Sequence, residues 1–223
     1  EFATEKTVNN VTLADVEEFY RDYFVPANAY LIVIGDVTLD EVKTLTDTFF
    51  TSWTKAVPPS FSYSEPKNVP NTQINLVDMP NAVQSEITVQ NLVNLKMKDD
   101  DFIAALLANQ ILGGGSDSRL NQNLREDKGY TYGAYTSLGN NKYAPSRFTA
   151  SAEVRNMVTD SSVVEILKEL ELINTQPVTE KELKTTKALY AGSFIMALED
   201  PQTIARYALN VEKEDLPKDF YKS

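Results

Sequence analysis

The segment ANQILGGGSDSRLNQNLREDKGYTYGAY (residues 108–135) determines the predicted fold, because it contains the end of one helix, a second helix and the start of a strand. It finishes a helix that starts after Asp99–Asp101 and ends at Gly113–Gly115, as glycine commonly ends helices. A second helix follows, with Leu120 and Leu124 on its inner side. Gly129 then separates this helix from a strand. The order helix, glycine turn, helix, strand predicts helices layered on a sheet.

The rest of the chain extends this pattern. Capping-box patterns at Thr12, Thr38 and Thr179 predict helix starts, and apolar runs predict strands. Further helices are expected over about 160–174 and from Asp200-Pro201, and strands over 30–34, 73–79, 85–93, 130–139 and 147–154. The 30–34 strand should be buried on both faces. We therefore predict an α+β, two-layer fold with helices packed on one face of a mixed, mainly antiparallel sheet.

The domain organisation follows from the linkers. The proline-rich stretch 57–70 is an extended connector rather than a boundary, because strands resume directly after it. Residues 1–223 are expected to form a single α+β domain, in which 1–27 is a leading helix from a preceding linker and 28–223 is the domain proper. The first residue is Glu1 rather than Met, so we expect a fragment of a longer protein.

Composition excludes several classes of function. The net charge of −11 and pI near 4.6 disfavour nucleic acid as a partner, and no apolar run is long enough to span a membrane. The sequence contains neither cysteine nor histidine. A Ser-His-Asp triad and the usual catalytic zinc sites are therefore impossible within this chain. The lack of cysteine fits, without requiring, the bacterial periplasm.

Three groups of residues could carry chemistry. Gly113–Gly115 could cradle a phosphate, but the lysine of a P-loop is missing and a helix end is favoured. Asp99–Asp101 could bind a cation, although a helix cap is favoured. Arg125 presents a fork of donors suited to carbonyl oxygens, and a tyrosine hydroxyl such as that of Tyr132 can donate to a polarised carbonyl. Taken alone, this pair is more simply explained by an ordinary ion pair and ring packing.

An ordered set of motifs resembles the insulinase-like (pitrilysin-type) zinc metallopeptidases. The set comprises FYRDYFVPANAYLIVIGDV (19–37), PNAVQSEI (80–87), the 108–135 segment and VTEKELKTTKALYAG (178–192). It covers most of the chain. The sequence from Leu112 to Tyr132 is the most specific part, and it looks most like the non-catalytic halves of bacterial two-part peptidases of this family.

The resemblance implies a substrate-binding role without metal. Arg125 and Tyr132 have the spacing of an arginine and a tyrosine that reach the peptide beside the zinc, and Gly129 would permit the turn between them. Zinc would lie in a catalytic half with an inverted His-x-x-Glu-His motif, in the same chain or a separate subunit. This chain alone should be inactive. The alternative is a degenerate, purely structural scaffold of the same family.

Overall fold

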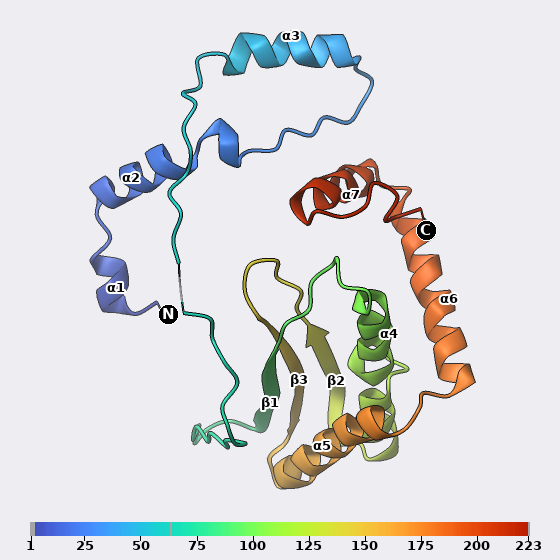
Figure 1. Cartoon of the computed structure of the whole chain (residues 1–223). Helices are drawn as coiled ribbons and strands as arrows, with labels where there is room; N and C mark the ends of the chain where they lie inside the picture. Colours follow the sequence, from blue (N-terminus) through green and yellow to red (C-terminus); the bar gives the residue numbers. More distant parts are fainter. Residues whose placement is uncertain (1–2, 63, 223) are drawn as a thin grey trace. The chain divides into compact units, whose positions relative to one another are not determined.

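The computed structural model describes residues 3–62 and 64–222. The chain forms two compact units, which are described separately (Figure 1). The first comprises residues 3–62, 64 and 200–212, and the second comprises 65–199 and 213–222. The single-domain organisation stays a prediction.

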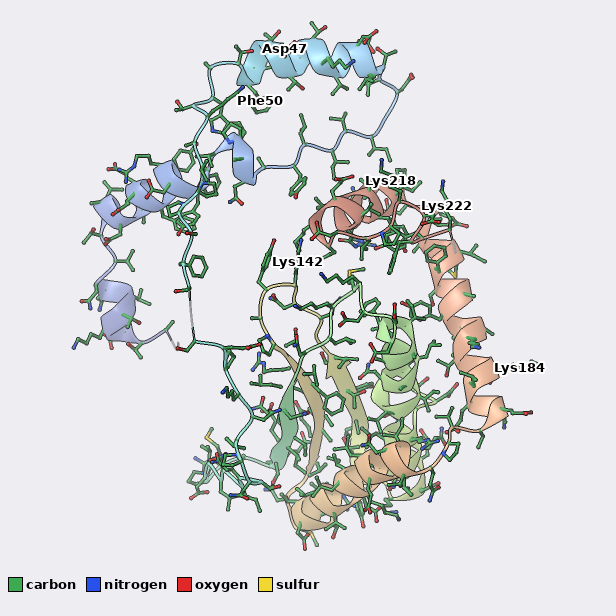
Figure 2. All side chains as sticks on the ribbon, viewed as in Figure 1. Asp47, Phe50, Lys142, Lys184, Lys218 and Lys222 are labelled. Atoms are coloured by element: carbon green, nitrogen blue, oxygen red, sulfur yellow. The ribbon has the colours of Figure 1, made fainter. Side chains whose placement is uncertain are left out.

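The first unit is helical. Its elements are α1 (Glu5–Asn9), α2 (Leu13–Tyr23), the 3-10 turn η1 (Pro26–Asn28), α3 (Leu39–Phe50) and α7 (Pro201–Lys213), whose last residue belongs to the second unit. The predicted capping boxes at Thr12 and Thr38 are both present. The indole N–H of Trp53 donates to the Phe24 carbonyl at 2.9 Å, which ties the end of α3 to the end of α2. Phe50 of α3 remains exposed (Figure 2).

Two predicted strands are wrong. Residues 30–34 lie outside any strand and their side chains are exposed, because the described part of the first unit offers no strand to pair with them. Residues 73–79 also make no ladder, although the predicted turn after them forms, with the Ala82 N–H donating to the Met79 carbonyl. At Leu92, the outer edge of β1 is instead occupied by the Asn68 side-chain amide. A strand needs a backbone partner as well as an apolar pattern.

The second unit contains the sheet. Its strands β1 (Gln84–Val93), β2 (Thr131–Leu138) and β3 (Ser146–Arg155) are antiparallel, in the order β1-β3-β2. Its helical elements are α4 (Phe102–Gly113), η2 (Asn121–Asp127), η3 (Asn156–Val158), α5 (Thr159–Thr175) and α6 (Glu180–Ala197). The α+β fold class is confirmed, and the three strands are all antiparallel.

The two faces of the sheet differ in polarity. The face under α4, η2 and α5 carries the apolar core, namely Ile87, Leu112, Leu120, Leu124, Ala134, Ala150, Ala152, Val154 and Ile166. The other face presents polar cross-strand pairs, such as Thr88 opposite Ser151 and Gln90 opposite Thr149. Because side chains alternate along a strand, these cross-strand pairs point away from the core. We call this second surface the open face.

The start of α6 is fixed by an ion pair. The Arg119 guanidinium donates from Nε and Nη2 to the two Glu182 carboxylate oxygens, at 2.7 and 3.1 Å. Glu182 also accepts from the backbone and hydroxyl of Thr179 in the predicted capping box. The Arg119 hydrogen bonds lower the pKa of Glu182 to about 2, with a further contribution from Thr179.

A Glu182→Gln substitution should therefore destabilise the protein in a pH-dependent manner. Glutamine can still cap α6, but it loses the charge, so we expect about 1–2 kcal/mol less stability at pH 7. The lowered pKa means that wild-type Glu182 contributes fully above pH 4.5 and loses its contribution as pH falls towards 2. Urea unfolding at several pH values should thus show the two proteins converging near pH 2. A difference that is independent of pH would contradict the ion-pair assignment.

Candidate functional site

The helix that carries Arg125 ends in a π-helical turn. Within η2, hydrogen bonds are one residue longer than in an α-helix, and the Lys128 N–H still donates to the Asn123 carbonyl at 3.2 Å. The Tyr130 N–H donates to the Leu124 carbonyl at 2.8 Å and closes the turn. Gly129, with φ +61°, occupies the left-handed region that L-residues avoid. The predicted sharp turn at Gly129 is therefore present.

Arg125 lies on the surface of this turn. Its side chain is 46% exposed, and its Nε lies 3.4 Å from a carboxylate oxygen of the neighbouring Glu126. An ion pair with so much solvent contact holds its partners weakly. The guanidinium is thus free to exchange this carboxylate for another acceptor.

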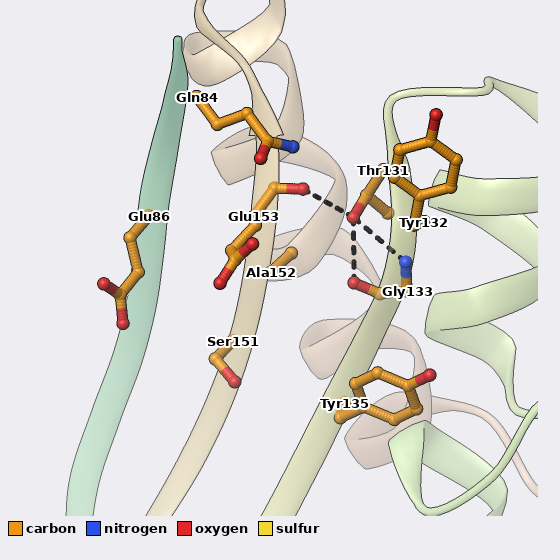
Figure 3. Close-up of a pocket in the computed structure, with 9 residues that line it drawn as sticks. All are labelled: Gln84, Glu86, Thr131, Tyr132, Gly133, Tyr135, Ser151, Ala152 and Glu153. Carbon is orange, nitrogen blue, oxygen red and sulfur yellow. Dashed lines mark hydrogen bonds between the residues drawn. The ribbon is translucent and has the colours of Figure 1, made fainter. Parts of the chain in front are cut away.

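Tyr132 is displaced outward by a bulge in β2. The pairing of β2 with β3 shifts between Thr131 and Ala134, so β2 has one extra residue there. The Thr131 hydroxyl donates towards the carbonyls of Gly133 and Glu153, at 2.9 and 2.6 Å, and accepts from the Gly133 N–H at 3.1 Å. Figure 3 shows these bonds beside Tyr132. The Tyr132 residue is 91% exposed, so its hydroxyl can meet a molecule outside this unit.

The buried amide of Asn121 joins the helix to the strand. Its side-chain oxygen accepts from the Ala134 N–H at 3.1 Å, and its Nδ2 donates to the Ala134 carbonyl at 3.0 Å. The same Nδ2 donates to the Gly115 carbonyl at 2.9 Å. Asn121 has no exposed surface, and these bonds fix the first residue after the bulge. Sequence reasoning missed Asn121; a polar residue between the inward-facing Leu120 and Leu124 was the available signal.

A second amide anchors the same helix to α5. Asn123 Nδ2 donates to carboxylate oxygens of Glu165 and Glu169, at 2.9 and 2.7 Å. This bond holds the pKa of Glu165 below its ordinary value, with Lys128 and Lys168 contributing in the same direction. The helix under Arg125 is therefore tied on one side to β2 and on the other to α5.

The structure brings the site residues to one end of the sheet but does not join them. Arg125 ends the helix, Gly129 turns the chain and Tyr132 follows on the bulge. Among the interactions of the described residues, no hydrogen bond links Arg125 to Tyr132. Each side chain is anchored by its backbone and is open to solvent at its polar end. Both polar ends are therefore accessible to groups outside this unit.

The other candidate groups have structural explanations. A Cβ on Gly113 would lie 2.7 Å from the Thr136 backbone nitrogen, so this glycine permits α4 to pack closely on β2. Asp99 accepts a hydrogen bond from the Lys96 N–H at 2.8 Å in the turn before α4, while Asp101 makes no side-chain cap.

The donors that zinc requires do not converge in the described part of the chain. No group of three His, Cys, Asp or Glu side chains that could hold a metal occurs among residues 3–62 and 64–222. The described residues therefore do not fit a zinc site. In the same described part, no helix is long and apolar enough to cross a membrane.

Comparisons with known proteins agree on one family. The family described as "Peptidase M16 inactive domain" matches residues 10–190. The "Zinc protease PqqE" of Helicobacter pylori is 25% identical over 203 residues, which is 89% of this chain and 45% of that protein. The "Probable inactive metalloprotease YmfF" of Bacillus subtilis is 20% identical over 200 residues, covering 90% of this chain and 46% of that protein.

A solved structure shares the fold. The crystal structure of a peptidase M16 inactive domain from Pseudomonas fluorescens has a TM-score of 0.84 and 24% identity, over 98% of this chain and 51% of that one. The chain thus spans about half the length of the relatives it matches.

Replacing the buried amide should loosen the site. In Asn121→Ala, the Ala134 N–H and C=O lose their partners, so we expect a loss of about 1–3 kcal/mol in unfolding free energy. Hydrogen exchange should also accelerate at the Ala134 amide. Gln122→Ala, at the exposed neighbouring position, is the matched control and should change stability by less than about 0.5 kcal/mol. Equal effects of the two substitutions would refute the role of Asn121.

The positive φ of Gly129 leads to a separate prediction about stability. A Cβ at this position meets nothing within 4 Å, so any cost comes from the backbone conformation alone. Gly129→Ala should destabilise by about 1–2 kcal/mol, whereas Gly129→Asn should cost less because asparagine tolerates positive φ. Thermal unfolding of the two variants distinguishes them. Identical losses would mean that φ does not determine the requirement for glycine.

Proposed function

Because the chain belongs to the M16 (insulinase-like) peptidases, as their inactive domain, we propose that it is the zinc-free, substrate-binding part of a zinc peptidase assembly. The observation that carries the proposal is Tyr132. This tyrosine lies in the family's motif context and projects from the β2 bulge into solvent. A packing role would not need such exposure.

Tyr132 would stabilise the charge that develops during peptide hydrolysis. As the scissile carbonyl is attacked, its oxygen becomes negative, and a phenol hydroxyl can donate a hydrogen bond to it. The bulge supports this role because backbone bonds through Thr131, rather than packing of the ring, hold Tyr132 in place. A donor fixed in advance does not have to reorganise when the oxyanion forms.

Arg125 would hold a neighbouring carbonyl of the same peptide. Its guanidinium has several donors, and within residues 3–62 and 64–222 only the exposed Glu126 competes for them. Gly129 would keep the two side chains within reach of one extended chain. Arg125 would therefore act on binding, and Tyr132 on the chemical step.

Zinc and the attacking water would come from a catalytic half with an inverted His-x-x-Glu-His motif. The donor set of the described residues does not fit zinc, so the two halves would contribute different groups to one active site. That half would lie in the same polypeptide or in a separate subunit. The periplasmic location stays a prediction.

A second candidate function is that of a structural scaffold which no longer supports cleavage. It is favoured by the similarity to a Bacillus subtilis relative named as a probable inactive metalloprotease. The presence of both Arg125 and Tyr132 favours the substrate-binding role instead.

Removing one hydroxyl separates these two functions. In the intact protein assembled with its catalytic half, Tyr132→Phe should lower kcat for an unfolded peptide by about 10²–10³, because one oxyanion donor is lost, with little change in KM. Tyr143→Phe, at another exposed tyrosine, is the matched control and should retain activity. Unchanged kcat in Tyr132→Phe would remove Tyr132 from the mechanism. An assembly that is inert and free of zinc would favour the scaffold.

A further inference from the structure

A hollow of about 360 Å³ lies on the open face beside Tyr132. It is bounded by β1, β3 and the bulged end of β2, and its lining includes two carboxylates, two tyrosines and an amide: Glu86, Glu153, Tyr132, Tyr135 and Gln84. We infer that this hollow binds a basic side chain, lysine or arginine, of the peptide. The inference rests on the proposed function and names the class of peptide that the site selects.

The two carboxylates are the first reason. Glu86 and Glu153 are direct partners in the β1–β3 register, and Figure 3 shows their side chains on adjacent strands. Like charges placed directly opposite each other in a sheet are unfavourable. Neither carboxylate forms an ion pair among residues 64–222. A cation bound between them would relieve the repulsion between the two carboxylates.

One cation at this end of the open face, Arg155, is already engaged elsewhere. Arg155 follows Glu153 by two residues and is the register partner of Gln84, so it lies at the same end of the open face. Its Nη2 donates to the Gly129 carbonyl at 3.3 Å, and it forms no ion pair with Glu86 or Glu153 in the described structure. The hollow therefore retains two negative charges.

The tyrosines supply a complementary surface. A Cβ on Gly133 would lie 2.6 Å from Tyr135 ring atoms, so the ring of Tyr135 lies directly against this glycine. Tyr132 and Tyr135 both remain at least half exposed. Lysine and arginine pack their aliphatic stems along aromatic rings, and their charged ends are attracted to the ring faces. The Gln84 amide adds a hydrogen-bond acceptor.

The location determines what the hollow would select. Because Tyr132 lines the hollow and would also meet the scissile carbonyl, a side chain bound here would belong to a residue close to the cleaved bond. An acidic side chain would meet two like charges. A neutral side chain would leave the carboxylates unpaired. The net charge of −11 would also raise the local concentration of basic peptides, although without distinguishing positions.

Peptide binding to the intact assembly tests the inference. Zinc is removed with a chelator so that no peptide is cleaved. Fluorescence anisotropy then compares a labelled unfolded peptide that contains one lysine with a matched peptide that has norleucine in its place. The lysine is moved along the peptide one position at a time. At one position, we expect about 3- to 10-fold tighter binding of the lysine peptide at low salt, and less at high salt.

A double substitution tests whether the two carboxylates of the hollow cause the preference for lysine. Glu86→Gln with Glu153→Gln should reduce it to less than about 2-fold. The control, Glu171→Gln with Glu180→Gln, removes the same charge from the exposed surfaces of α5 and α6 and should preserve it.

Three results would overturn the inference: no preference in the wild type, retention of the preference in the Glu86/Glu153 variant, or equal loss in the control. Cleavage that depends on Tyr132 but not on peptide charge would leave the proposed function standing without this pocket. A lysine preference in an assembly that does not cleave would support the pocket and remove the proposed function.

Discussion

The buried amide of Asn121 is the contact on which the geometry of the site depends. It satisfies both backbone groups of Ala134, the first regular residue after the bulge, and also holds the loop at Gly115. The helix that carries Arg125 and the strand that carries Tyr132 therefore share one polar joint inside an apolar core. Because such a joint has a defined hydrogen-bond geometry, it specifies one arrangement where apolar packing alone would allow several.

The sheet gives this joint its two environments. Beneath it, alanine and valine on β3 let the helices pack closely, and the polar groups of the joint are shielded from water. Above it, the open face carries carboxylates, hydroxyls and amides that are free to meet a ligand. The alternation of side chains along three short strands is enough to separate an apolar core from a polar surface.

Much of this fold follows from the sequence. The helices with capping boxes at Thr12, Thr38 and Thr179 form as their patterns predict, because each contains its own start signal within four residues. Residues 30–34 and 73–79 could not be assigned in this way, since an apolar run does not show whether a pairing edge is available. For the site, the turn at Gly129 was predictable from local chemistry. The Asn121 joint was not predictable, because it depends on how the helix packs against β2. The opposition of Glu86 and Glu153 was not predictable either, because it depends on strand register, which no local pattern reveals.

The bulge in β2 has a consequence for how this domain can change over evolutionary time. Tyr132 contributes almost nothing to the core, and the backbone around it is held by Thr131 and Ala134. Its side chain can therefore be replaced without unfolding the domain. A change in the length of the bulge, in contrast, would move the side chains of the rest of the strand to the opposite face of the sheet. Selection for stability preserves the fold but does not act on the Tyr132 hydroxyl. A lineage can accordingly lose this hydroxyl in a single substitution and keep the fold.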